Sequence, residues 1–161
     1  MATAPQTVRT DPYRAFNFLV RLVDSSGSPG DATQGQQGSP AGGFSECSGI
    51  EMMLDVEEYK EGGNNGGSLR FPTRVKWTNI RLKRGMALTD DLWDWHYSFV
   101  QGQVTRRDGV VTLLDEQQNP VKTWSFRRGL PVKWTGPSMN ASNNQVAIEE
   151  LEIAHEGLKL L

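Results

Sequence analysis

The sequence has few of the residues on which enzyme and export chemistry usually depend. It contains a single cysteine, Cys47, and two histidines in 161 residues, and its formal net charge is only -2. A lone cysteine cannot form an internal disulfide, so the chain does not require an oxidising compartment for disulfide formation. Near-neutral charge argues against a dedicated nucleic-acid binder, which normally carries a basic excess. No apolar run is long enough to span a bilayer, and residues 1–10 lack the apolar core of a secretory signal.

Each potential catalytic or ligand-binding motif is incomplete. His155-Glu156 lacks the second histidine of a zinc-protease helix, and His96 has no paired ligand nearby in the sequence. Cys47 would need a histidine partner in space to act as a nucleophile. Residues 62–67, G-G-N-N-G-G, lack the Lys-Ser/Thr of a phosphate-binding loop. We therefore expect no catalytic, cofactor-binding or metal-ligating residue, no cofactor, and a protein that is not an enzyme.

The residues that are abundant indicate a mainly β protein. Seventeen glycines and five tryptophans favour strands, turns and interfaces over a helical bundle. Residues 110–126 predict a hairpin around the turn D-E-Q-Q-N-P, and residues 130–135 alternate as a separate strand after a break at 127–129. Further extended segments are expected at residues 13–23, 44–48, 50–59 and 70–84. In the last of these the alternation slips near Thr78 and Asn79, which predicts a β-bulge.

One helix is predicted, over residues 90–101. Thr89 is placed to cap it, Asp90 and Asp91 lie in the first turn where the helix dipole favours negative charge, and Gly102 is placed to end it. The apolar stripe of this helix consists of Leu92, Trp95, Phe99 and Val100. Residues 146–155 fit neither the helical nor the strand period cleanly, so the sequence pattern alone leaves their structure open.

The length suits a single domain, residues 1–161, with one modest core. Two polar segments interrupt this domain. Residues 24–42 contain no large apolar side chain and predict a mobile surface loop. Residues 61–69 are rich in Gly and Asn and predict a second flexible loop.

An ordered set of short motifs resembles the tail-tube family of contractile phages and phage-derived injection systems. The strongest part is P-V-K-W-T-G-P-S-M-N-A (131–141) followed by V-A-I-E-E-L-E-I-A-H-E-G-L (146–158). The remaining motifs follow the family order: D-P-Y-R-A-F-N-F (11–18), G-F-S-E-C-S-G-I-E (43–51), E-E-Y-K-E-G-G-N-N (57–65), N-I-R-L-K-R-G (79–85) and L-W-D-W (92–95). The chain departs from the family in the longer connection at 24–42. The resemblance implies that residues 146–155 form a strand.

The resemblance also implies an architecture and a set of partners. The expected fold is a small antiparallel β-barrel or sandwich with one flanking α-helix, assembling into homohexameric rings that stack into a hollow, rigid tube. Sheath contraction would drive this tube through the target envelope for passage of cargo or DNA. The expected partners are further copies of the chain, a sheath protein, baseplate or hub and spike proteins, a tube terminator, and cargo or DNA in the lumen, with no membrane anchor. Assembly is expected in the cytoplasm of the producing cell, within a phage-like particle that can be released.

Charge patterning suggests which residues serve assembly. The basic run 70–84 is expected to pair with the acidic runs 51–61 and 149–156 rather than with nucleic acid. Residues 57–70 form the candidate extension that orders on meeting a neighbouring subunit, with Glu58, Tyr59, Glu61, Asn64, Asn65 and Arg70 as hypothetical self-assembly residues. Glu149 and Glu152 are the hypothetical acidic residues of the lumen wall.

Two other functions fit the sequence. The first is a tube initiator at the baseplate, which would share the same fold. The second is a monomeric β-barrel module that binds a ligand through its tryptophans. Rings or filaments in electron microscopy would favour either tube function, whereas a monodisperse monomer with a ligand-dependent melting shift would favour the binding module.

Overall fold

The structure, a computed structural model, describes residues 12–25, 43–60, 62, 67–86, 88–142 and 144–161. Nearly all of the expected loop at 24–42, and most of the glycine-rich loop at 61–69, lie outside the described residues. The described elements are nine strands and one helix: β1 (Phe18–Asp24), β2 (Glu46–Ser48), β3 (Met52–Tyr59), β4 (Leu69–Trp77), β5 (Ile80–Gly85), α1 (Asp91–Val100), β6 (Arg107–Leu114), β7 (Pro120–Thr135), β8 (Ile148–Ala154) and β9 (Leu158–Leu160).

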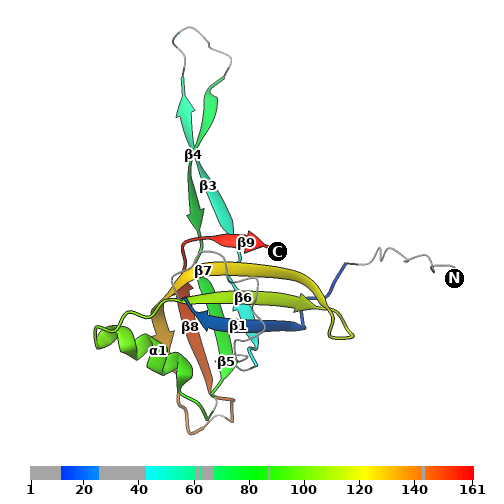
Figure 1. The fold of residues 1–161 in the computed structure, drawn as a ribbon, viewed down its shortest axis with the longest axis vertical. Coiled ribbons are helices and arrows are strands. Elements are labelled where there is room, and N and C mark those ends of the chain that lie inside the picture. The colour runs from blue at the N-terminus through cyan, green and yellow to red at the C-terminus, as the bar shows by residue number, and fades with distance from the viewer. Residues whose placement is uncertain (1–11, 26–42, 61, 63–66, 87, 143) are drawn as a thin grey trace, which may run out of the picture.

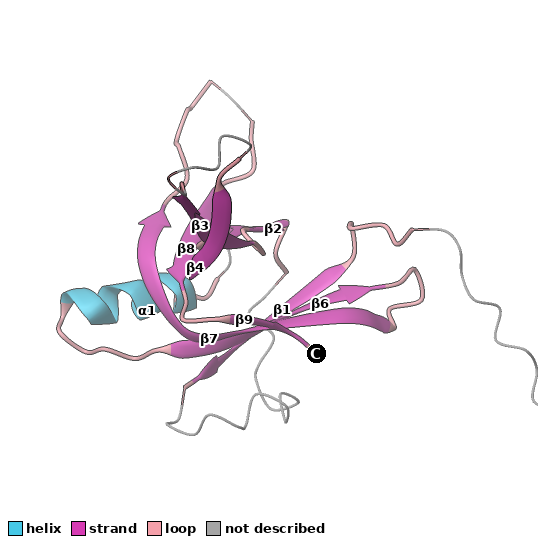
Figure 2. Ribbon diagram, turned by 90° about the horizontal axis from the view of Figure 1, so that it is seen from above, coloured by secondary structure: helices cyan, strands magenta, loops and turns pink. Residues whose placement is uncertain are grey.

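A seven-stranded antiparallel sheet forms the body of the molecule. Its strand order is β1-β6-β7-β8-β5-β2, and β9 also pairs with β7 (Figure 1). Strand β7 belongs to both halves of this sheet, because its first part pairs with β6 and β9 and its last part pairs with β8. The bend in β7 folds the two halves over each other (Figure 2). This arrangement confirms the expected small β-sandwich with one flanking helix.

The hairpin predicted at residues 110–126 is confirmed, with Val111 opposite Trp124. The strand that the family resemblance implies at 146–155 is also confirmed as β8. The predicted break at 127–129 is wrong, because β7 runs without interruption through 16 residues. The chain bends there instead: Arg128 has a φ of 53°, and a Cβ on Gly129 would lie 2.7 Å from the Arg107 carbonyl oxygen. Glycine is therefore required at the bend because the neighbouring backbone occupies the space of a side chain.

Residues 70–84 do not form one bulged strand. The slip in alternation at Thr78 and Asn79 marks the end of β4 and the start of β5, which pair with different strands. Strand β4 pairs only with β3, in a separate two-stranded sheet, whereas β5 lies between β2 and β8. The predicted bulge is wrong at this place. A register shift lies instead inside the β3–β4 hairpin, between Leu54 and Val56.

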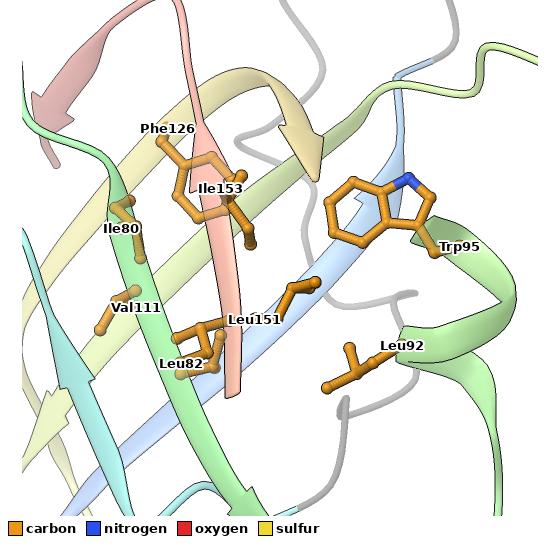
Figure 3. Packing of buried hydrophobic residues seen from close by; sticks show 9 residues of the cluster. Ile80, Leu82, Leu92, Trp95, Val111, Phe126, Leu151 and Ile153 are labelled. Carbon is orange, nitrogen blue, oxygen red and sulfur yellow. The ribbon is translucent and has the colours of Figure 1, made fainter. Parts of the chain in front are cut away.

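The core lies between the two halves of the sheet, and α1 contributes to it from one end. Figure 3 shows Leu92 and Trp95 of α1 directed toward side chains of β5 and β8. The Trp95 indole donates a hydrogen bond of 2.8 Å to the Thr105 carbonyl, so its polar atom is satisfied. The buried apolar residues are Val20, Ile80, Leu82, Leu92, Trp95, Val111, Phe126, Leu151 and Ile153.

Helix α1 begins and ends close to the predicted positions. Asp90 occupies the N-cap position without a side-chain capping bond, and the Thr89 hydroxyl instead donates to Asp91 at 3.3 Å, so the predicted cap at Thr89 is wrong. Gly102, with a φ of 82°, donates its amide to the Phe99 carbonyl and ends the helix as expected. Val100 is 70% exposed, so it does not belong to the buried stripe. No helix in the described part of the chain is both long enough and apolar enough to cross a membrane.

Candidate assembly surfaces

The β3–β4 hairpin projects away from the body of the molecule (Figure 1). It pairs with no other described strand, and a lone two-stranded hairpin is only marginally stable in water. Its large apolar side chains are nevertheless exposed. Eight of them are between 43% and 69% exposed: Met52, Met53, Leu54, Val56, Tyr59, Leu69, Phe71 and Val75. Exposed apolar surface of this extent on an uncovered strand pair is typical of a binding surface.

These side chains form two clusters. Met52, Leu54 and Val56 alternate along one face of β3, and Val75 lies directly opposite Leu54; we call these four residues the base cluster. Nearer the end of the hairpin, Tyr59 lies opposite Leu69, and Phe71 follows two residues later on the same strand. We call Tyr59, Leu69 and Phe71 the tip cluster.

Ion pairs run along the hairpin beside its apolar clusters. Arg70 contacts Glu58 at 2.9 Å, and Lys76 contacts Asp55 at 2.7 Å. The expected pairing of the basic run with the first acidic run is therefore confirmed. Both pairs are exposed, so each contributes little to stability, about 0–1 kcal/mol. Of the hypothetical self-assembly residues, Glu58, Tyr59 and Arg70 lie together on this hairpin, while Glu61, Asn64 and Asn65 lie outside the described residues.

The outward face of β2, β5 and β8 carries alternating charges. Cross-strand register places Lys83 between Glu46 and Glu150, and places Arg81 beside Glu152. Lys83 contacts Glu46 at 2.9 Å, and this hydrogen bond raises the pKa of Lys83. Glu152 accepts a hydrogen bond of 2.8 Å from the Asn79 side chain and lies 3.8 Å from Arg81. The face is thus polar and close to charge balance.

Glu149 does not share this face. Residues three apart on a strand point to opposite sides, and Glu149 lies in the buried row of β8 with Leu151 and Ile153. Its side chain is only 5% exposed, so it does not present a carboxylate to solvent. The expectation that Glu149 and Glu152 act together on one wetted wall is therefore wrong for Glu149.

Glu149 instead belongs to a buried polar network. Arg84, directly opposite on β5, donates from Nε to Glu149 Oε1 at 2.6 Å and from Nη2 to Asp91 Oδ1 at 2.6 Å. The Trp134 indole donates to the other Glu149 oxygen at 2.9 Å. Burial opposes the charge of Arg84, but the hydrogen bonds to Asp91 and Glu149 outweigh this effect and raise its pKa. The network ties β5, β7 and β8 to the first turn of α1.

The two histidines contact backbone carbonyl groups of the protein itself, and the cysteine is a partly buried thiol. His96 lies with Nδ1 3.2 Å from the Pro131 carbonyl oxygen, and His155 donates from Nε2 to the Thr78 carbonyl at 3.1 Å beside Trp77 and Phe126. Burial and the neighbouring Glu46 charge raise the pKa of Cys47 to about 11, so its thiol is protonated near neutral pH. Across the described ranges, no three His, Cys, Asp or Glu residues are grouped in a way that could hold a metal ion.

Sequence reasoning missed the exposure of the base cluster. Its alternation on residues 50–59 is the pattern of a half-buried strand, and periodicity alone does not say what covers the apolar face. The sequence did not reveal that β4 pairs with β3 in a separate two-stranded sheet and that the chain enters the main sheet only at β5. The glycine-rich segment after Tyr59 is the available signal for a projecting hairpin.

The fold and these surfaces define the class of the protein: a small β-sandwich with one helix, open sheet edges and a projecting apolar hairpin suited to contacts with other subunits. The model of one protein family matches residues 14–159. The chain belongs to this family, that of the T4-like virus tail tube protein gp19. It is a family of structural tube proteins rather than of enzymes. No curated protein matches the chain.

Solved structures support the same fold. A chain in the cryo-EM structure of the anti-feeding prophage (AFP) baseplate, 6-fold symmetrised, is similar with a TM-score of 0.81 and 25% identity, covering 95% of this chain and 97% of that one. A chain in the sheath-tube complex of an extracellular contractile injection system (PVC), in its extended state, has a TM-score of 0.77 and 23% identity, with coverages of 100% and 99%. A chain in the AFP tube-terminating cap has a TM-score of 0.76 and 21% identity, with the same coverages.

Proposed function

We propose that this protein is the inner-tube subunit of a contractile injection system or phage tail, stacking as rings into a hollow tube. The observation that carries the proposal is the projecting hairpin, whose apolar side chains are uncovered in a chain that belongs to a tail tube family. Such a surface is unfavourable in a solitary subunit and favourable where another subunit covers it. The similarity to chains in sheath-tube, baseplate and terminator assemblies supports the same set of partners.

Open edges of the large sheet provide a second route to assembly. Among the described strands, β1 pairs on one side only, with β6, and β2 pairs on one side only, with β5. An unpaired edge offers backbone donors and acceptors to a strand of another chain. Head-to-tail joining of different edges with a rotation that closes produces a ring. We propose a homohexamer, in line with the 6-fold symmetry of the AFP baseplate assembly.

The outward face of β2, β5 and β8 is our candidate for the lumen wall. Its charged residues are solvated or paired with each other, and neither the base cluster nor the tip cluster lies on it, although the exposed Ile148 stands in the same row of β8 as Glu150 and Glu152. Of the two glutamates first assigned to the lumen, only Glu152 remains in this proposal. A wall on which Arg81 and Glu152 alternate has little net charge and holds neither an acidic nor a basic cargo by long-range attraction.

Electron microscopy of the purified protein, with sheath and baseplate proteins supplied, tests the proposal. Hollow polymers built from rings of six subunits are expected. Solitary subunits under every assembly condition would refute the tube function. A ligand-dependent melting shift in such solitary subunits would instead support the monomeric binding module.

The second candidate is the baseplate-proximal tube initiator. The observation in its favour is the TM-score of 0.81 to a chain of the AFP baseplate, against 0.77 for the sheath-tube complex. An initiator forms one ring on the baseplate and presents one face to the main tube. Growth beyond a single ring from the purified chain alone would therefore favour the main tube, and a single ring that accepts a different tube protein would favour the initiator.

The proposed setting is a phage-like contractile particle. Assembly in the cytoplasm of the producing cell, followed by release of the particle, is the course we propose. Fractionation of producing cells before lysis, followed by microscopy of the soluble fraction, tests it: finished tubes inside intact cells are expected.

A further inference from the structure

The exposed face of helix α1 carries an aromatic surface that is braced from the core. Trp93 and Tyr97 lie one turn apart, are 41% and 43% exposed, and stack with ring centroids 5.6 Å apart. Trp134 of β7 meets Trp93 in a T-shaped arrangement, with centroids 4.7 Å apart. The indole of Trp134 is in turn hydrogen-bonded to the buried Glu149. The two exposed rings are therefore already ordered before any partner binds, which lowers the entropic cost of a contact.

The same face is acidic. Helix α1 contains two aspartates and no lysine or arginine. Asp91 contacts the buried Arg84 at 2.6 Å, whereas Asp94 is exposed and lies three residues before Tyr97, on the same side of the helix. Aromatic ring faces and carboxylates both attract cations. We call Trp93, Asp94 and Tyr97 the helix platform, and its chemistry suits a segment that combines a positive charge with aromatic side chains.

The segment just before β1 has this composition. Residues 13–16 read Tyr-Arg-Ala-Phe, and we call them the entry arm. Tyr13 and Phe16 are 44% and 68% exposed, and Arg14 is exposed between them. Tyrosine, tryptophan and arginine are the residues most often found at the energetic centre of protein interfaces. The entry arm and the helix platform are thus complementary both in charge and in aromatic character.

The two surfaces lie at opposite ends of the β1–β6 pair (Figure 1). At one end, the side-chain amide of Asn17 donates to the Asp115 carbonyl at 2.9 Å, just beyond β6. At the other end, the Arg107 guanidinium at the start of β6 lies 4.9 Å from the ring centroid of Trp95 in α1. The 7 residues of β1, at about 3.3 Å each, separate these ends by about 20 Å. The entry arm therefore does not reach the helix platform of its own chain.

The line that joins the two surfaces crosses the molecule. Figure 1 shows β1 and β6 running across the long axis along which the β3–β4 hairpin projects. A contact between the platform of one copy and the arm of the next is heterologous, and such contacts form a ring when the rotation closes. Each copy supplies one platform and one arm, so a second copy is the partner that is always present in matching amount.

We propose that the helix platform receives the entry arm of the adjacent copy in the same ring. Arg14 of one copy pairs with Asp94 of the next and lies against the aromatic rings, while Phe16 packs beside Trp93. The contact rests on the proposed tube function and adds to it a ring interface in which the hairpin takes no part.

Exchange of the two charges tests the contact while keeping both aromatic surfaces. Arg14→Asp and Asp94→Arg should each raise the protein concentration for half-assembly by at least about tenfold, because like charges would meet. The double variant brings opposite charges together again and should return to within about threefold of the unaltered chain. Lys159→Asp, at an exposed residue of β9 outside both surfaces, is the matched control and should assemble normally. Sedimentation velocity measures assembly, and equal melting temperatures of the dilute proteins establish that each variant folds.

Cross-linking identifies the two surfaces directly. In a Cys47→Ser background, one protein carries Ala15→Cys in the entry arm and the other carries Val100→Cys, at a helix residue 70% exposed. The two proteins are mixed, assembled and treated with a short bismaleimide, and a covalent dimer with one copy of each is expected. Gln117→Cys, exposed and at the same end of the subunit as the arm, should give no mixed dimer in place of Val100→Cys.

The outcomes separate this contact from the tube function. Normal assembly of both single charge variants, or no mixed dimer in rings that form, would overturn the contact and leave the tube function intact. Trp93→Ala should also raise the half-assembly concentration about tenfold. Normal rings from Trp93→Ala that no longer bind the sheath protein would assign the platform to the sheath and overturn the proposal. Absence of rings and tubes from the unaltered chain would overturn the tube function and this contact with it.

Discussion

Removal of either partner of the Arg84–Glu149 pair should destabilise the subunit strongly. The two side chains are 3% and 5% exposed, and their closest atoms lie 2.6 Å apart. Breaking a buried ion pair by removing one member costs about 3–5 kcal/mol, because the other charge is left without its partner. This cost reflects the orphaned charge and not the net contribution of the pair.

The hydrogen-bond partners that remain after each substitution predict which variant loses more unfolding free energy. In Glu149→Gln, Arg84 keeps its hydrogen bond to Asp91, so the loss of unfolding free energy should lie near about 3 kcal/mol. In Arg84→Met, Glu149 keeps only the Trp134 indole, so the loss should approach about 5 kcal/mol. The double variant Arg84→Met with Glu149→Leu removes both charges, and its loss should be well below the sum of the two single losses.

Urea unfolding followed by tryptophan fluorescence measures these differences. The measurements belong at a protein concentration at which light scattering shows single subunits, because assembly would otherwise add to the unfolding free energy. Asp94→Asn, at an exposed carboxylate of the same helix, serves as the control and should change stability by less than about 0.5 kcal/mol. Single losses below about 1 kcal/mol would refute the reasoning, because a truly buried pair cannot be broken at so small a cost.

Three further predictions concern the body of the subunit. Gly109→Ala should cost about 2–3 kcal/mol, because its Cβ would lie 2.0 Å from the buried Phe126 ring, whereas Gly43→Ala meets nothing within 4 Å and should be neutral in the same urea titration. Leu151→Ala, at a residue with no exposed surface, should cost about 3–4 kcal/mol by the same measurement, and a cost below about 1 kcal/mol would contradict the core described above. Burial lowers the pKa of His155, against its hydrogen bond to Thr78. Below about pH 6.5 the unfolded chain thus binds more protons than the folded one, and stability is lost as pH falls toward the folded pKa. Melting temperatures of His155→Asn should accordingly depend less on pH in this range than those of the unaltered chain, and an identical dependence would count against the role of His155.

Local signals were sufficient for much of the body. The turn D-E-Q-Q-N-P between two apolar runs predicted the β6–β7 hairpin, and Gly102 predicted the end of α1, because both features act over a few residues. The strand β8 was different. Its glutamates obscure the alternation, and only the family resemblance favoured a strand over a helix.

The errors at the candidate sites have one physical cause. Alternation assigns residues to faces but does not say which face is covered or by which strand. Glu149 follows the buried parity of Leu151 and Ile153, and Arg84 follows that of Ile80 and Leu82. Two opposite charges at equivalent positions of two apolar rows are the signal that could have revealed the buried pair, provided the β5–β8 pairing was known. That pairing links residues far apart in sequence, which no local pattern supplies.

The distribution of apolar residues separates stability from assembly within one small chain. The body buries its own apolar core and pairs Arg84 with Glu149 inside it. The hairpin differs from the body because its apolar clusters are exposed. Its ion pairs are also at the surface, where they contribute little to stability. In the proposed tube, such a subunit gains its remaining apolar burial on joining other copies. Because the hairpin pairs with none of the described strands of the body, we expect a charged substitution there to impair assembly while leaving the fold of the body intact.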